Sequence, residues 1–337
     1  MLSELIVALT LIGTLVGAGF ASGQELVQFF LTLGNKAPQA IVLMGVLLSI
    51  EAFMVRSLAL RWRTSSYHDF FINVLGNWYL IADIIITAFL FGGFCIMLAG
   101  AGSVAKHYLG LTSFIGSLIC GGLALIACLG RGRGIFTLNF LLVPVMLVII
   151  IMIGCKNLPS SQISIMEIPA KGLVTTNWII NAFLYVTYNM VTGMVLLTSL
   201  PSSKNGAIGA AIGSIVLAAL AFLLIIVLSQ LSLEGLQKEL PLLYFVSEFQ
   251  PNLKNLYAIV LLLAMITTAT GDLYGLAERL GKIPHLTPQL VAIILLLIAL
   301  PLTNLGFTSL IAWIYPVFGY LGLFVVILSL KRILGNI

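Results

Sequence analysis

Long apolar runs separated by short polar segments dominate the pattern of hydrophobic and polar positions along the chain. Each run is about 18 residues or longer, so a helix formed from it can cross a hydrocarbon core about 30 Å thick. The pattern predicts an all-α membrane protein in which residues 1–337 form a single transmembrane domain. We predict ten transmembrane helices, at residues 4–33, 37–61, 77–105, 111–129, 134–154, 175–199, 205–230, 253–279, 287–303 and 307–330.

Two connections between the predicted spans are longer and more polar than the others. Residues 62–76 are expected to form a helix at the membrane interface. Residues 231–252 are expected to form a partly apolar segment that caps one side of the bundle.

The composition supports the membrane assignment and excludes other classes of protein. The sequence is 61% hydrophobic and only 8% charged, whereas a soluble domain averages about 25% charged residues. The net charge of +5 comes from basic residues scattered singly or in pairs between apolar runs. Because no basic stripe is present, nucleic acid is not an expected partner.

The distribution of basic residues between the predicted loops sets the expected orientation. Ten of the sixteen Lys and Arg residues fall on the side of the N-terminus and six on the opposite side. Cytoplasmic loops carry the excess of Lys and Arg, so both termini are expected to face the cytoplasm. The first run contains Glu4 and follows no basic segment, which indicates a retained helix rather than a cleaved signal peptide.

The predicted spans divide into two halves of nearly equal length. Residues 1–154 contain five spans and residues 175–331 contain the other five. Because five is odd, the second half enters the membrane from the side opposite to the first. Two halves of opposite orientation are what an inverted-topology repeat requires.

The first predicted span is too long and too rich in glycine for one continuous helix. Residues 4–33 exceed the about 20 residues that a perpendicular helix needs, and Gly17, Gly19 and Gly23 each lower helix propensity by about 1 kcal/mol relative to alanine. The polar residues 22–25 follow at mid-membrane depth, where non-helical backbone occurs only beside a cavity or within protein. We predict a broken helix; the alternative is a packing face in which Gly19 and Gly23 form a GxxxG motif.

The first span of the second half has a polar interruption at the matching place, residues 185–193. Asn189 and Gly193 are poor helix formers, so helices 1 and 6 are both expected to be broken. Matching interruptions in the two halves point to the binding site of a transporter, and aromatic side chains could line or gate it. The residues expected to bind substrate are Gly17, Ala18, Gly19, Ser22, Gly23, Phe94, Tyr185, Tyr188, Asn189 and Thr192.

Acidic residues within the predicted spans are candidates for function, because charges at this depth are costly. They are Glu25, Glu51, Asp83 and Asp272. Glu25 follows the break, where a helix N-terminus stabilises a carboxylate and where Glu25 would compete with the carboxylate of an amino-acid substrate. Either Glu25 points elsewhere, or it couples transport to protons, or the substrate is cationic. Asp83 and Asp272 are expected to pair with loop arginines such as Arg279 or Arg131.

The segment Gly-Ala-Gly-Phe-Ala-Ser-Gly-Gln-Glu at residues 17–25 and the ten-span layout resemble the YkvI-type family of bacterial membrane proteins. That family is similar to the amino acid–polyamine–organocation transporters of the LeuT fold. The resemblance covers essentially the whole chain in topology, and its motifs lie in spans 1, 2 and 8. It implies a LeuT-like 5+5 inverted repeat in the bacterial cytoplasmic membrane, with Glu51 of span 2 bracing the broken span 6.

The same resemblance implies a sodium site. Ala264, Thr267 and Thr268 share one helical face, and their spacing resembles the Ala-x-x-Thr-Ser/Thr segment of LeuT-fold symporters. Carried over to this sequence, the ligands are the carbonyls of Gly13, Val16 and Ala264 and the two threonine hydroxyls. The alternative is that both threonines donate to carbonyls of their own helix.

These features predict a secondary active transporter that carries an amino acid or related small organic solute by alternating access. The expected partners are that solute, a monovalent cation (sodium), and the lipid bilayer, with no covalent cofactor. Two alternatives remain: a proton-coupled transporter that uses Glu25, and a non-transporting, ligand-sensing receptor subunit of the same fold. An enzyme is not expected, because the sequence contains no HExxH, GxSxG or Walker A pattern.

Overall fold

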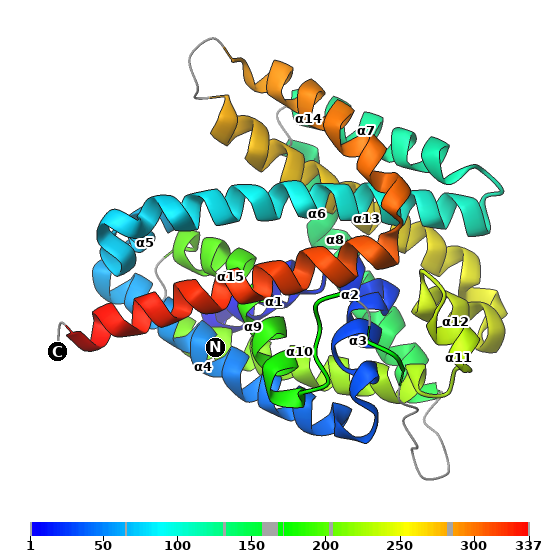
Figure 1. Cartoon of the computed structure of the whole chain (residues 1–337), viewed down its shortest axis with the longest axis horizontal. Helices are drawn as coiled ribbons and strands as arrows, with labels where there is room; N and C mark the ends of the chain where they lie inside the picture. Colours follow the sequence, from blue (N-terminus) through cyan, green and yellow to red (C-terminus); the bar gives the residue numbers. More distant parts are fainter. Residues whose placement is uncertain are drawn as a thin grey trace.

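The computed structural model describes residues 2–64, 66–130, 133–156, 168–170, 172–201, 205–281 and 286–335, which form helices and no β-strand (Figure 1). The α-helices are α1 Leu2–Leu15, α2 Ala18–Ser22, α3 Gln24–Phe29, α4 Ala37–Trp62, α5 Tyr67–Leu75, α6 Tyr79–Tyr108, α7 Ser113–Leu129, α8 Arg133–Lys156, α9 Trp178–Ser199, α10 Gly206–Leu228, α11 Leu233–Leu236, α12 Pro241–Phe249, α13 Lys254–Leu280, α14 Pro288–Leu302 and α15 Phe307–Gly335. Short 3₁₀ helices are η1 Leu31–Lys36, η2 Gly76–Trp78, η3 Pro251–Leu253 and η4 Thr303–Leu305.

Each of the ten predicted spans coincides with helix, and seven of the helical stretches in the described residues are long and apolar enough to cross a membrane. These seven are Leu31–Trp62, Tyr79–Tyr108, Trp178–Ser199, Gly206–Leu228, Pro251–Leu280, Pro288–Leu305 and Phe307–Phe324. Shorter apolar helices occupy the other three predicted spans, at Glu4–Leu15, Ser113–Leu129 and Pro144–Lys156. The chain is therefore an all-helical membrane protein, while ten crossings and the inverted repeat stay predictions.

The length and surface of the helices suit a bilayer. The 30 residues of α6 correspond to about 45 Å at a rise of about 1.5 Å per residue, which exceeds the hydrocarbon thickness. Large apolar side chains point outward from several helices, and Ile84, Ile126 and Leu297 are each more than 60% exposed. An outward-facing apolar surface of this kind is stable when lipid covers it.

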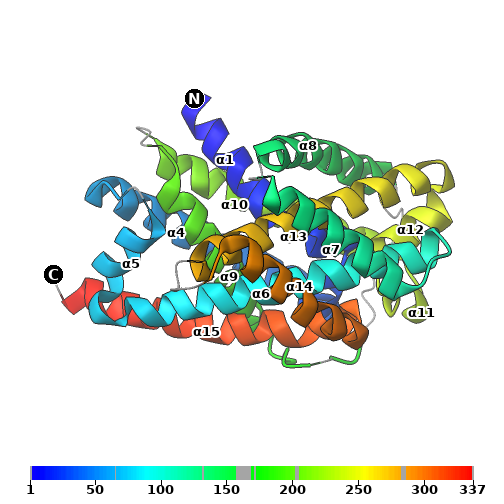
Figure 2. The ribbon, with the colours of Figure 1, turned by 90° about the horizontal axis from the view of Figure 1, so that it is seen from above.

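The helices pack as a bundle that places α4, α9 and α15 side by side. Helix α9 packs against α4 and α15, α10 packs against α1 and α4, and α6 packs against α7 and α13. The long helices run along the length of the molecule, with α5 at one end and α11 and α12 at the other (Figures 1 and 2). The segments expected at the interface and in the cap thus lie at opposite ends of the bundle.

Polar side chains in the connections cap the N-termini of several helices. Asn177 Oδ1 accepts hydrogen bonds from the backbone N–H groups of Ile179 (2.9 Å) and Ile180 (3.4 Å) at the start of α9. Ser66 caps α5 and Thr287 caps α14 in the same manner. Such caps satisfy N–H groups that have no partner within their own helix.

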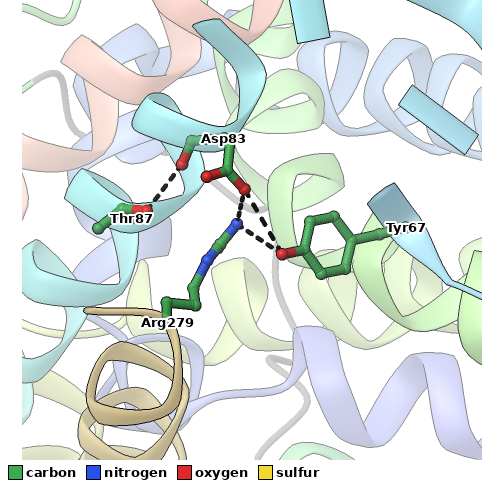
Figure 3. Close-up of polar contacts among 4 residues, drawn as sticks. All are labelled: Tyr67, Asp83, Thr87 and Arg279. Carbon is green, nitrogen blue, oxygen red and sulfur yellow. Dashed lines mark hydrogen bonds and ion pairs between the residues drawn. The ribbon is translucent and has the colours of Figure 1, made fainter. Parts of the chain in front are cut away.

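Asp83 of α6 pairs with Arg279 of α13, as the sequence predicted (Figure 3). Arg279 Nη2 also donates to the hydroxyl of Tyr67 at 2.7 Å, and its guanidinium lies 4.9 Å from the centre of the Tyr67 ring. The cluster joins α5, α6 and α13 at the end of the bundle where α5 lies. Asp272, by contrast, forms no ion pair with any described residue, and Arg131 lies outside the described residues.

Arg56, which lies in the predicted span 37–61 and was counted among the basic residues on the side of the N-terminus, is buried. It is only 1% exposed, and its guanidinium donates to the carbonyls of Leu197 (2.8 Å), Leu200 (3.0 Å) and Pro201 (2.5 Å) at the C-terminal end of α9. Its charge therefore stabilises the negative end of α9. Because several loop residues, including Arg131, Lys171, Lys204 and Lys282, lie outside the described residues, the orientation of the termini stays a prediction.

Candidate functional site

The first span is broken, as the sequence predicted. Helix α1 ends at Leu15, and Gly17 is extended (φ −80°, ψ −178°) before α2 begins at Ala18. A second interruption follows at Gly23, which has φ +81° and separates α2 from α3. This left-handed conformation strongly favours glycine, so the spacing of glycines in the sequence sets the two joints of the segment.

Glu25 lies across the break. A Cβ added to Gly19 would collide with Oε1 of Glu25, so the carboxylate rests directly on the Gly19 backbone. The other carboxylate oxygen, Oε2, accepts a hydrogen bond of 2.6 Å from the hydroxyl of Tyr188 on α9. Glu25 and Tyr188 are only 4% and 3% exposed. Glu25 therefore points into the break and not away from it.

The contacts at Gly19 also bear on the two interpretations of the glycines. The three atoms nearest to where a Gly19 Cβ would lie all belong to Glu25. Gly17 faces open space, because no atom lies within 4 Å of where its Cβ would be. Only Gly23 is in close contact with neighbouring helices, through Leu228 and Leu242. A GxxxG packing face therefore does not account for Gly19.

Aromatic rings surround the Glu25–Tyr188 contact. The Tyr188 ring stacks on Tyr315 of α15, with ring centres 4.7 Å apart and an interplanar angle of 9°. On its other side the Tyr188 ring lies 5.3 Å from Phe29 of α3 and 5.2 Å from Tyr185. The Tyr185 hydroxyl is buried and has no hydrogen-bond partner among the described residues. The site thus combines a carboxylate, two phenol groups and flat apolar surfaces.

Other contacts hold the broken segment in place between α9 and α13. The hydroxyl of Tyr257 on α13 donates to the carbonyl of Ala21. The side-chain amide of Asn181 on α9 donates to the carbonyl of Phe29 at 3.1 Å. Within the segment, Ser22 donates to the Gly19 carbonyl (2.7 Å) and accepts from the Gln24 N–H (3.2 Å). These side chains satisfy backbone groups that an unbroken helix would have paired internally.

The prediction that helix 6 is broken is wrong, because α9 is one continuous helix from Trp178 to Ser199. Asn189 donates to the carbonyl of Tyr185 (2.9 Å), and Thr192 donates to the carbonyl of Asn189 (3.0 Å). Polar side chains in this stretch therefore bond to their own helix instead of replacing its backbone hydrogen bonds. A single glycine, Gly193, is not enough to interrupt a helix that packs against α4 and α15.

The backbone at the first break has carbonyl groups available for a ligand. Two hydrogen bonds that would continue a helix are absent from this described stretch: Gly17 N–H to the Gly13 carbonyl, and Phe20 N–H to the Val16 carbonyl. On α13, Thr267 donates to the Ala264 carbonyl at 3.0 Å, which is the alternative foreseen for this threonine. Thr267 is buried and Thr268 is half-buried. The sodium site stays a proposal.

Three other predicted site residues form no hydrogen bond or ring contact with Glu25 or Tyr188 in the described part of the chain. Phe94 of α6 is fully buried but takes no part in the ring contacts among the described residues. Asp272 of α13 lies against Gly93, where an added Cβ would be 2.7 Å from its Oδ2. Glu51 faces the far side of α9, and its Oε1 has no hydrogen-bond partner among the described residues. Glu51 therefore does not brace α9 by a hydrogen bond.

Sequence reasoning missed Tyr315, Phe29, Tyr257 and Asn181, although all four contact the broken segment or its partner Tyr188. Each is a polar or aromatic residue within an apolar run, which is a signal shared by many residues that only pack. No pattern along the chain links α3 to α15, so their contact could not be foreseen.

Two glycines of the break provide a matched test of the Glu25 geometry. We expect Gly19→Ala to displace the Glu25 carboxylate from Tyr188, so that a further Tyr188→Phe change costs no additional stability. In the wild type, Tyr188→Phe should lower the free energy of unfolding by about 1.5–3 kcal/mol, the usual contribution of a hydrogen bond to a charged group. Thermal unfolding in detergent micelles measures both quantities.

The control is Gly17→Ala, because a methyl group at Gly17 meets open space. Combined with Tyr188→Phe it should give additive effects, as expected for changes that do not interact. Additive effects for Gly19→Ala as well would contradict the contact between Glu25 and Gly19.

Comparison with proteins of known sequence identifies relatives of the whole chain. No protein-family model matches it. The chain is 29% identical over 328 residues to the uncharacterized protein YyaD of Bacillus subtilis, covering 95% of this chain and 94% of YyaD. It is 28% identical over 331 residues to the uncharacterized membrane protein YkvI of the same organism, covering 94% of this chain and 92% of YkvI.

Solved structures with the same fold include two of Mhp1. The inward-facing conformation of Mhp1 matches with a TM-score of 0.62 at 16% identity, covering 89% of this chain and 69% of Mhp1. A closed conformation of Mhp1, a nucleobase–cation–symport-1 family transporter with bromovinylhydantoin bound, matches with a TM-score of 0.58 at 14% identity, covering 96% and 74%. The chain is a homologue of the bacterial membrane proteins YkvI and YyaD, with the LeuT-type fold of Mhp1.

Proposed function

We propose that the protein is a secondary active transporter that moves a small organic solute across the bacterial cytoplasmic membrane, coupled to a cation. The observation that carries this proposal is the first span, which is interrupted at Gly17 and Gly23 and holds a buried carboxylate against a tyrosine of α9. Broken helices with polar groups at mid-membrane depth are typical of the binding sites of secondary transporters. The likeness of the fold to Mhp1 supports the same class of function.

The position of Glu25 narrows the class of solute. Its carboxylate occupies the place beside the break where the carboxylate of an amino-acid substrate was expected. None of the described Lys or Arg side chains pairs with it. A carboxylate without a cationic partner attracts a positive charge or an N–H donor. We therefore propose an amine or a nitrogen heterocycle whose positive charge or N–H group contacts Glu25.

An uptake screen tests the proposal. The purified full-length chain would be placed in proteoliposomes and offered labelled amines, nucleobases, hydantoins and amino acids. Each solute would be tested under an inward sodium gradient, an inward proton gradient and no gradient. We expect gradient-driven uptake of one nitrogen-rich class, abolished by an ionophore. Saturable binding without flux for every solute would instead favour the receptor-subunit alternative.

We further propose that the coupling cation is sodium. Substitution of two threonines of α13 tests this. We expect Thr267→Ala combined with Thr268→Ala to raise the sodium concentration for half-maximal uptake about tenfold or more, because two of five proposed oxygen ligands are lost. Uptake at varied sodium concentration measures this shift.

Thr270→Ala is the matched control on the same helix. Thr270 is also buried and donates to a carbonyl of its own helix, that of Ile266, at 2.8 Å. Its loss should leave the sodium dependence unchanged. If the double variant also keeps the wild-type dependence, or if uptake persists when sodium is replaced, the coupling ion is not sodium and Glu25 becomes the candidate proton carrier.

A further inference from the structure

A cavity lies on the far side of α9 from Glu25. It has a volume of about 260 Å³ and is enclosed by α4, α5, α9 and α15. On α9 its lining includes Phe183, Val186 and Thr187. Tyr185 and Tyr188, which face the Glu25 site, lie on the opposite face of the same part of α9. At 100° per residue the two sets point in nearly opposite directions, so the width of α9 separates this cavity from the Glu25 site.

Among the described residues that line this cavity, Glu51 is the one with a charged side chain, and the rest of the lining is almost wholly apolar. Its Oε1 is buried and has no hydrogen-bond partner in the part of the chain that the structure describes. The hydroxyl of Thr187 does not serve it, because that group donates to the carbonyl of Gly319 at 2.6 Å and to that of Phe183 at 2.9 Å. Buried polar groups are rarely left without a partner, and a carboxyl group least of all.

The rim of the cavity shows from which side a ligand arrives. Ile50 and Met54 of α4 and Phe183 of α9 line the cavity and are also exposed at the surface of the bundle. In a membrane this apolar rim faces lipid, so a ligand reaches Glu51 from the bilayer. The volume fits a compound of roughly ten non-hydrogen atoms, and it is far too small for a two-chain phospholipid.

We propose that this cavity, the α4–α9 pocket, binds a small amphiphilic amine whose ammonium group contacts Glu51 and whose hydrocarbon part lies among the apolar side chains. The ammonium supplies the hydrogen-bond donor and the positive charge that Glu51 lacks. The apolar lining contributes the hydrophobic part of the binding free energy. The pocket is distinct from the Glu25 site and does not depend on the proposed transport function.

Binding of n-octylammonium to the full-length chain in phosphatidylcholine nanodiscs tests the proposal. Labelled octylammonium should bind saturably to the wild type. Glu51→Gln, which keeps the shape of the side chain, should weaken this binding about tenfold or more, as expected for loss of a charge-assisted contact. Competition by the neutral isostere octan-1-ol should be the same in both proteins, because the alcohol does not use the charge.

A second variant keeps the test valid if Glu51→Gln fails to fold. Met54→Trp leaves Glu51 in place and fills the pocket from its rim, so it should weaken binding of both octylammonium and octanol. Wild-type affinity for octylammonium in Glu51→Gln, or loss in Glu25→Gln instead, would overturn the proposal. Displacement of octylammonium by phosphatidylethanolamine added to the nanodisc would assign the pocket to a lipid headgroup and would also overturn it.

Discussion

Replacing Glu25 with glutamine is expected to reduce cation-driven uptake about 100-fold, which corresponds to the roughly 3 kcal/mol that a hydrogen bond to a charged group contributes at most. The glutamine side chain has the same shape and still accepts a hydrogen bond from Tyr188. It carries no charge, however, so it neither attracts a cationic solute nor holds a proton. Initial uptake rates in proteoliposomes, for the solute that the wild type carries, measure the loss.

Two further variants separate charge from geometry. Tyr188→Phe removes the hydroxyl that donates to Glu25 at 2.6 Å but keeps the ring that stacks on Tyr315. It should reduce uptake by about tenfold, which is less than the loss for Glu25→Gln because the charge remains. Glu248→Gln changes an exposed carboxylate on α12 and should leave uptake unchanged. Wild-type uptake by Glu25→Gln would remove Glu25 from the mechanism.

The largest loss of stability is expected for Arg56→Ala. Arg56 is 1% exposed and donates to three carbonyl groups at the C-terminal end of α9. Alanine would remove three hydrogen bonds from a charged donor, and a hydrogen bond to a charged group contributes about 1.5–3 kcal/mol. We expect the free energy of unfolding to fall by at least about 3 kcal/mol. Denaturant or thermal unfolding in micelles measures it.

Arg61→Ala provides the matched control, since Arg61 lies on the same helix and is exposed. It should change stability by less than about 0.5 kcal/mol, as is usual for surface positions. Arg56→Lys should be intermediate, because an ammonium group cannot span the three carbonyls as the planar guanidinium does. Equal stability of the Arg56 and Arg61 variants would show that the contacts to α9 contribute nothing.

Most of the helical layout could be predicted from the sequence, because apolar run length and helix length are set by the same requirement. The span expected at residues 37–61 is α4, Ala37–Trp62, and that expected at residues 205–230 is α10, Gly206–Leu228. The ion pair of Asp83 and Arg279 was also foreseen, since a charge in an apolar run needs a partner. These are properties of local composition, which the chain displays directly.

The two predicted helix interruptions, of which only the first is present, show where local composition stops being sufficient. Three glycines within seven residues did break the first span, but polar residues around Asn189 did not break α9. Glycine removes helix preference whatever its surroundings, whereas Asn and Thr side chains can bond to carbonyls of their own helix. Which of these occurs depends on tertiary neighbours that the sequence does not reveal.

The partners within the site were beyond sequence reasoning for a different reason. Glu25 and Tyr188 are 163 residues apart, and Tyr315 stacks on Tyr188 from a third helix. Nothing in the sequence around Arg56 indicated that its guanidinium is buried against the end of α9. Contacts between distant segments depend on how the helices pack, which one sequence alone does not specify.

The unequal construction of the two spans that meet at Glu25 bears on how the protein would move. Helix α9 is continuous and anchored at its end, so it acts as a stiff wall. The segment opposite it has one joint at Gly17 and another at Gly23, each at a glycine whose backbone needs little energy to rotate. A reorientation that exposes Glu25 to one side of the membrane and then to the other would therefore be a swing of the short α2–α3 piece, with α9 as the fixed frame.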